Sequence, residues 1–206
     1  MSFGRLSEDQ EKVLAPFVKD KIVHDLGAGF CDLSLRLLEL GASRVVAIDK
    51  DRMPRLEHLA GRVAQARATF AEAAGFGSPG GFSDEEARRA RSLARTIDVA
   101  FLSWPRENKV PGLVELLGRA RIVVYLGKNT DMSMCGWPGM FLEALLPRSV
   151  LAHAPEQRNT LIVYGPRSNE PRRILGEEAA ALAAGEAPPR VVTWEKTEAH
   201  DAALEK

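Results

Sequence analysis

The stretch "HDLGAGFCDLS", residues 24–34, separates an apolar run from an amphipathic segment. With the residues before it, "KIVHDLG" (21–27) has the pattern of a buried strand that ends at glycine. The segment "DLSLRLLELG" (32–41) has the apolar spacing of a helix, and "RVVAIDKD" (44–51) is a second buried strand. The pattern predicts a strand, a glycine loop, a helix and a parallel strand in succession.

Composition restricts the possible classes of protein. A chain of 206 residues with 45% hydrophobic residues has the size of a single domain with one full core. The chain has 28 Lys and Arg residues and 28 Asp and Glu residues. This balance argues against a broad basic surface for nucleic acid and allows only local basic patches. The chain has two cysteines and no basic-then-apolar leader, a combination that predicts a cytoplasmic protein. It has no apolar run of about 20 residues, so we expect a soluble protein without a membrane anchor.

The periodicity continues to alternate along the chain. It predicts helices over residues 6–20, 55–65, 84–96, 110–120 and 138–147. It predicts further strands over residues 67–73, 97–105, 121–127 and 159–165, with an edge strand possible at 190–196. We therefore expect an α/β fold of the Rossmann-like, doubly wound type, with a mostly parallel sheet and helices on both faces. We expect the domain to cover residues 1–175 and a C-terminal extension to cover 176–206.

The chemistry of the glycine loop limits its ligand. A dinucleotide loop has the form G-x-G-x-x-G, but after Gly27 and Gly29 this chain has Asp32 at the last position, where a carboxylate would repel a pyrophosphate. S-adenosylmethionine instead carries a sulfonium and an ammonium group and has no phosphate. Asp25 is placed to accept hydrogen bonds near that ammonium group, and Asp49, twenty residues after Gly29, to accept both ribose hydroxyls.

The stretch "VHDLGAGFCDLSLRLLELGASRVVAIDKD" resembles the first motif and following acidic strand end of the class I S-adenosylmethionine-dependent methyltransferases, whose motif is acid-x-G-x-G-x-G. The resemblance implies a seven-stranded sheet with its last strand antiparallel. It implies that the donor is bound by Asp25, Gly27, Ala28, Gly29, Phe30, Asp49 and Lys50. Cys31 replaces the third glycine, and Glu72 or, failing it, Ala74 is the nearest candidate for the adenine amino group.

The stretch "FLSWPREN" (101–108) ends a strand that, in the resembled superfamily, borders both the donor and the acceptor. Ser103 could exchange a hydrogen bond with either ligand, and Trp104 could stack on a flat or cationic acceptor. These two residues are the expected catalytic pair. The alternative is that Trp104 only caps the core and that Pro105 only ends the strand.

A second acceptor-binding candidate is the loop "GKNTDMSMCGWPG" (127–139), which combines polar, aromatic and glycine residues after a strand. Lys128, Asn129 and Trp137 are its expected substrate-binding residues, and the loop could act as a lid. The alternative is an ordinary connection, although unstructured connections longer than about 12 residues are uncommon.

The remaining polar residues favour no other chemistry. Cys31 has no base partner at a suitable spacing, so we expect it to be a small packed residue. No histidine has a partner at the spacing of metal ligands, so no metal site is expected. The basic stretch "EEARRARSLAR" reads as a solvated helix face with balancing acids.

The sequence thus predicts a cytoplasmic S-adenosylmethionine-dependent methyltransferase whose acceptor, small or macromolecular, is open. Two alternatives remain: a noncatalytic S-adenosylmethionine-binding sensor or partner subunit, and a nucleotide-dependent reductase, against which Asp32 counts.

Overall fold

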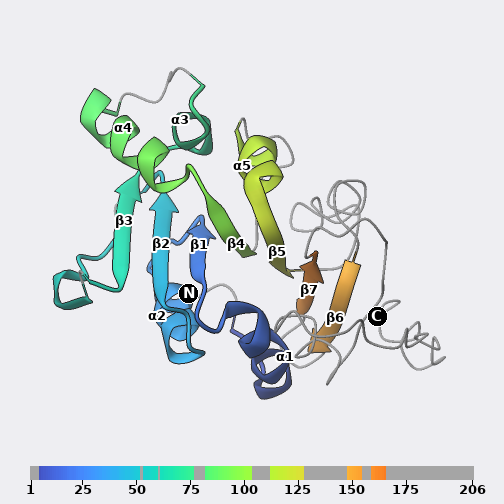
Figure 1. Ribbon diagram of the computed structural model, residues 1–206. Helices are drawn as coiled ribbons and strands as arrows, with labels where there is room; N and C mark the ends of the chain where they lie inside the picture. The colour runs from blue at the N-terminus through green and yellow to red at the C-terminus, as the bar shows by residue number, and fades with distance from the viewer. Residues whose placement is uncertain are drawn as a thin grey trace.

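The fold is built on one seven-stranded sheet, seen in a computed structural model that describes residues 5–51, 53–59, 61–76, 82–103, 112–127, 148–154 and 159–165 (Figure 1). The strand order is β3-β2-β1-β4-β5-β7-β6. The strands are β1 (Ile22–Leu26), β2 (Arg44–Asp49), β3 (Val63–Arg67), β4 (Ile97–Ser103), β5 (Ala120–Gly127), β6 (Arg148–Ala154) and β7 (Asn159–Tyr164). Pairs from β3 to β5 are parallel, whereas β7 is antiparallel to both β5 and β6. The predicted mostly parallel sheet with an antiparallel last strand is confirmed.

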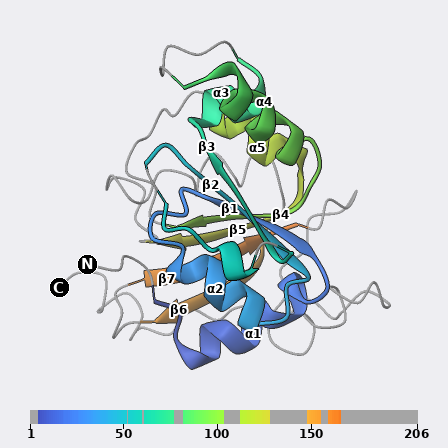
Figure 2. The ribbon, with the colours of Figure 1, turned by 90° about the vertical axis from the view of Figure 1, so that its left-hand side faces the viewer.

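Helices cover both faces of this sheet. They are α1 (Glu8–Val18), α2 (Asp32–Glu39), α3 (Phe70–Ala74), α4 (Asp84–Leu93) and α5 (Leu113–Arg119), with a short 3-10 helix, η1, at Glu57–Leu59. Figure 2 shows α1 and α2 on one face and α3, α4 and α5 on the other. The predicted doubly wound arrangement is therefore correct.

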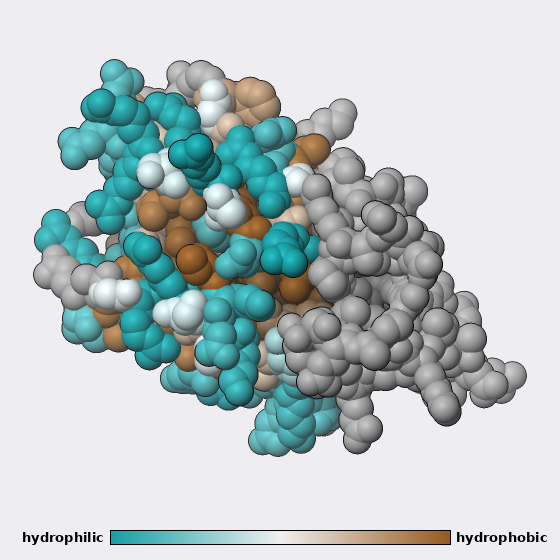
Figure 3. Space-filling model, in the orientation of Figure 1, coloured by the Kyte–Doolittle hydropathy of each residue, from teal (hydrophilic) through white to brown (hydrophobic). Residues whose placement is uncertain are grey.

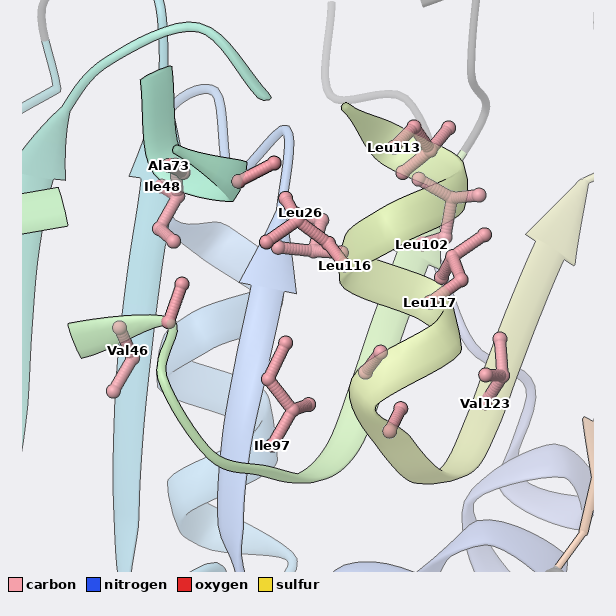
Figure 4. Packing of buried hydrophobic residues seen from close by; sticks show 14 of the residues in the cluster. Leu26, Val46, Ile48, Ala73, Ile97, Leu102, Leu113, Leu116, Leu117 and Val123 are labelled. Carbon is pink, nitrogen blue, oxygen red and sulfur yellow. The ribbon is translucent and has the colours of Figure 1, made fainter. Parts of the chain in front are cut away.

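The core has two parts because alternate residues of each central strand point to opposite faces. On the face of α3 to α5, Leu26, Ile48 and Leu102 pack with Leu113 and Leu116 of α5 (Figure 4). On the other face, the buried strand residues Val23, Val45, Val99 and Val124 pack with Phe17 and Leu37 of α1 and α2. Strands that are buried on both faces need nearly continuous apolar runs, and this requirement explains the sequence pattern.

Capping residues fix where two of the helices begin. Ser7 Oγ accepts from the Gln10 N–H at 3.2 Å, and Gln10 Oε1 accepts from the Ser7 N–H at 3.1 Å, so α1 begins with a capping box. Ser83 caps α4 in the same way with Glu86. Such caps satisfy backbone N–H groups that a helix leaves without internal partners.

Two predicted elements around β3 are wrong. The region 55–65 is not one helix: its described residues form η1 and the start of β3, with Gly61 between them. The region 67–73 is not a strand, since α3 begins at Phe70 behind a third capping box, formed by Thr69 and Glu72. β3 has few large apolar residues, so its strand state depends on pairing with β2, which a local pattern does not record.

Other differences lie near the C-terminus. β6, at residues 148–154, was not predicted and pairs with β7. The predicted helix at 138–147, the edge strand at 190–196 and the extension at 176–206 lie outside the described residues. In the part of the chain that the structure describes, no helix combines the length and apolar character needed to cross a membrane.

One glycine fixes how α5 meets α3. Gly112 precedes α5 with φ of +85°, a conformation that residues with a Cβ rarely adopt. A Cβ added there would lie 2.3 Å from the carbonyl oxygen of Phe70 and 2.6 Å from Cα of Ala71. The two helices can approach this closely only because residue 112 has no side chain.

We therefore predict that Gly112→Ala lowers the free energy of unfolding by about 2–4 kcal/mol, the sum of backbone strain and overpacking. Gly118→Ala is the matched control, because it lies inside the same helix with nothing within 4 Å of an added Cβ. That variant should be neutral or gain up to about 1 kcal/mol of helix propensity. Urea unfolding followed by circular dichroism measures both, and equal stability of the two variants would contradict the packing account.

Candidate functional site

The loop between β1 and α2 adopts backbone conformations that glycine favours. φ is +83° at Gly27 and +52° at Gly29. The Gly27 N–H donates to the carbonyl oxygen of Ile48 at 2.8 Å, which ties the loop to the end of β2. A Cβ at Gly29 would meet no atom of the described residues within 4 Å, so these residues leave room for a close approach to the backbone there.

Cys31 occupies the position of the missing third glycine. Its φ is +62°, so a residue with a side chain here adopts the left-handed conformation that glycine would adopt freely. The side chain is fully buried against Ala28 and Ala47, and Gln65 Nε2 lies 3.6 Å from its sulfur. Burial raises the pKa of the Cys31 thiol to about 11, so the thiol is protonated at neutral pH. These features support the prediction that Cys31 packs and does not act as a nucleophile.

The carboxylate of Asp25 is buried, which is unusual for an acidic side chain. Its side chain is only 1% exposed, and Ser34 Oγ on α2 donates to its Oδ2 at 2.6 Å. The other oxygen, Oδ1, is buried and has no hydrogen-bond partner in the described part of the chain. Burial, with a smaller contribution from the nearby Asp49 carboxylate, raises the pKa of Asp25 to about 6. An ionised carboxylate in this position lacks a donor that a ligand could supply.

A second buried polar atom without a partner lies on the neighbouring strand. Asp25 pairs in register with Phe101 of β4, so Ser103, two residues later, shares the face of the sheet that Asp25 occupies. The Ser103 Oγ is buried and makes no hydrogen bond within the residues described. β1 and β4 thus place two unsatisfied oxygens on one face, near the glycine loop.

Asp49 connects the end of β2 to the same loop. Its Oδ2 accepts from the Gly29 N–H and its Oδ1 from the Asp51 N–H, each at 2.8 Å. Each carboxylate oxygen has a further lone pair, and the residue is partly exposed, so Asp49 can accept more hydrogen bonds. Lys50 beside it is exposed, and so is Phe30, whose side chain is 72% exposed.

The two residues expected to meet an adenine amino group have other roles. Glu72 is fully buried, and its Oε2 accepts from both the N–H and the Oγ1 of Thr69 at 2.8 Å, so it caps α3. Ala74 is 8% exposed and belongs to the core. The adenine assignment itself stays a prediction. The T-x-x-E spacing of a capping box was the signal that sequence reasoning missed here.

The predicted acceptor residues Trp104, Lys128, Asn129 and Trp137 lie outside the described residues. Their roles remain predictions. Within the described ranges, no group of three or more His, Cys, Asp or Glu side chains could hold a metal ion.

Comparisons with known proteins extend only to structure. No family model and no curated protein sequence matches the chain. The chain is similar to a "Putative hemolysin from Streptococcus thermophilus", with a TM-score of 0.51 and 16% identity over 90% of this chain and 75% of that one. It is also similar to 1,6-didemethyltoxoflavin-N1-methyltransferase of Burkholderia thailandensis, which was solved with S-adenosylhomocysteine, at a TM-score of 0.48 and 15% identity over 76% and 78% of the chains. The first similarity shows a shared fold.

The buried Asp25 carboxylate should lower stability where it is ionised. Its pKa rises from 3.8 to about 6 on folding, so the folded state holds the proton more tightly and the free energy of unfolding falls as pH rises between these values. Asp25→Asn removes this cost and should gain about 1–3 kcal/mol near pH 8, but much less near pH 4. Urea titrations at both pH values test this prediction. Asp32→Asn, an exposed acid in the first turn of α2, is the control and should show no such gain.

Proposed function

We propose that the protein binds S-adenosylmethionine at the carboxyl ends of β1 and β2 and transfers its methyl group to an acceptor. The observation that carries the proposal is the buried Asp25 Oδ1, which finds no hydrogen-bond partner among the residues that the structure describes and lies beside the glycine loop. A cationic ammonium group supplies both a charge and N–H donors to such an atom. Ligands are expected at this edge of an open α/β sheet.

The surrounding residues match the other parts of the donor. Ser103 Oγ can accept from the same ammonium group or donate to the adjoining carboxylate of an amino-acid moiety. Gly29 leaves room for close approach to the backbone. Asp49 keeps acceptor capacity for two ribose hydroxyls next to that glycine. Residues of β1 and β4 would thus recognise the amino-acid end of the donor, and Asp49 of β2 would recognise its ribose.

The same charges disfavour a dinucleotide. Asp25, bonded to Ser34 of α2, and Asp32 in the first turn of that helix place two carboxyl groups near the start of α2, where a pyrophosphate would have to sit. Repulsion between like charges grows as water is excluded from a site. A reductase that used a nicotinamide dinucleotide would need a neutral or basic loop here.

In this proposal the bound donor supplies a methyl group on a positively charged sulfur. The work of the chain is to hold the donor and to align an acceptor in line with the sulfur and methyl carbon at about 3–3.5 Å. Asp25 would compensate the charge of the amino-acid end, and Ser103 is the last residue of β4, directly before the predicted acceptor residue Trp104 in the sequence. Such a transfer needs a base only for an acceptor that is protonated.

Calorimetric titration separates the candidate ligands. S-adenosylmethionine and S-adenosylhomocysteine should both bind, because they share the amino-acid and ribose groups that the site recognises. NAD and NADP should give no measurable heat. Tighter binding of either dinucleotide would overturn the proposal, and donor binding without turnover on any acceptor would favour a sensor.

Asp49 provides a residue-level prediction. Asp49→Ala should weaken donor binding about tenfold to a hundredfold, because a charged acceptor of two hydroxyl donors is lost. Asp51→Ala is the matched control: its side chain is exposed, and only its backbone N–H bonds to Asp49. The control should bind the donor as the parent does. Circular dichroism confirms folding, and equal affinities of parent and Asp49→Ala would remove Asp49 from the site.

A further inference from the structure

The outer face of α4 and the adjoining edge strand β3 carry four exposed arginines: Arg67, Arg88, Arg89 and Arg91. α4 buries Ala87 and Ala90 against the core, so Arg88, Arg89 and Arg91 spread over the side that faces solvent. Figure 3 shows hydrophilic residues gathered over α4. We propose that this surface, called here the α4 edge, binds the phosphate backbone of single-stranded RNA.

Three of these guanidinium groups are held by one nitrogen only. The Arg89 Nε donates to the carbonyl oxygen of Gln65 at 3.0 Å, the Arg88 Nε to that of Asp84 at 3.2 Å, and the Arg67 Nε to that of Lys50 at 3.4 Å. In the described part of the chain the terminal Nη atoms of these arginines make no hydrogen bond or ion pair. Each side chain is thus oriented while its two terminal donors stay available, an arrangement suited to a phosphate.

Other arginines of the chain use those same atoms internally. Arg36 pairs through its Nη atoms with Glu11 and Glu39 on α1 and α2. Arg119 donates from its Nη atoms to the carbonyl oxygens of Ala74 and Ala94. The α4 edge differs from these two arginines because its terminal donors stay available, and from the exposed Arg44 and Arg121, at the starts of two separate strands, because it gathers four arginines on one surface.

The acids of α4 do not neutralise the α4 edge. They occupy only its first turn, at Asp84, Glu85 and Glu86, and Glu86 is engaged with the N-cap Ser83. Among the described residues no carboxylate lies within 4.0 Å of a charged nitrogen of any of the four arginines. The positive charges follow in the second and third turns, so the helix is acidic at its start and basic beyond it.

Two phenyl rings lie among these arginines. The Arg67 guanidinium stacks over Phe82 with Cζ 5.1 Å from the ring centroid. Phe76 is 52% exposed and follows Gly75, where an added Cβ would lie 3.7 Å from Cδ of Arg91. Phe82 is half-buried and stacked by Arg67, whereas the exposed ring of Phe76 is available to an unstacked base, which single-stranded RNA displays and a duplex does not. An acidic peptide would use the charges but not the rings.

The proposal does not rest on donor binding, since the α4 edge can be tested without donor. The α4 edge adjoins the candidate donor site, because the Arg67 Nε donates to the carbonyl oxygen of Lys50, the residue after Asp49. A strand of RNA held on the α4 edge would pass beside the candidate donor site.

The test measures fluorescence anisotropy of labelled polyuridylate, duplex DNA and polyglutamate with the full chain. The test variant carries both Arg88→Gln and Arg89→Gln. The control variant carries both Arg44→Gln and Arg121→Gln, which remove two exposed arginines from the starts of β2 and β5. The first double variant should bind polyuridylate about tenfold or more weakly. The slope of log affinity against log salt concentration should become shallower by about two. The control pair should change the affinity less than about twofold.

Phe76→Ala tests the contribution of the ring and should weaken polyuridylate binding about fivefold or more, without changing duplex binding. Circular dichroism checks that each variant is folded. The proposal is overturned if the parent fails to bind polyuridylate at low salt, or if both double variants lose affinity equally. Duplex DNA or polyglutamate bound as tightly as polyuridylate would also overturn it.

Discussion

The carboxylate of Asp25, buried at the end of a central strand, is the constraint on which the candidate site depends. A packed core would normally exclude it, since burial raises its pKa to about 6 and one of its oxygens has no internal donor. Ser34 supplies a single hydrogen bond from α2. The fold therefore keeps a destabilising group at the point where strand, loop and helix meet, which is typical of a residue retained for a ligand.

The rest of the architecture keeps that point in place. The loop after Asp25 is bonded to the end of β2 through Gly27 and Gly29, and the α3–α5 contact at Gly112 closes the opposite face. Cys31 fills the space toward β2 that the third glycine would leave empty. The site is thus made of backbone held by neighbouring strands, with few side chains of its own.

The glycine loop and Asp49 could be predicted from sequence because a short-range pattern encodes them: an acid and two glycines at the end of one apolar run, and an acid at the end of the next. α1 and α4 could also be predicted, because the residues that cap them lie directly before each helix in the sequence. β3 and β6 could not be found in this way, since each becomes a strand through pairing with a neighbour. The capping role of Glu72 is also local, because Thr69 and Glu72 have the T-x-x-E spacing of a capping box. The unsatisfied oxygens of Asp25 and Ser103 are properties of burial, which no pattern of letters records.

The central claim is that Asp25 becomes the ionised partner of a cationic donor. Calorimetric titration with S-adenosylmethionine, in buffers of different ionisation enthalpy, counts the protons that binding releases. Because the pKa of the free protein's Asp25 is about 6, donor binding near pH 5 should release about 0.9 proton and near pH 7 about 0.1. Asp25→Asn should abolish the release. Donor binding that releases no proton near pH 5, or that releases the same number in the Asp25→Asn variant, would contradict the account.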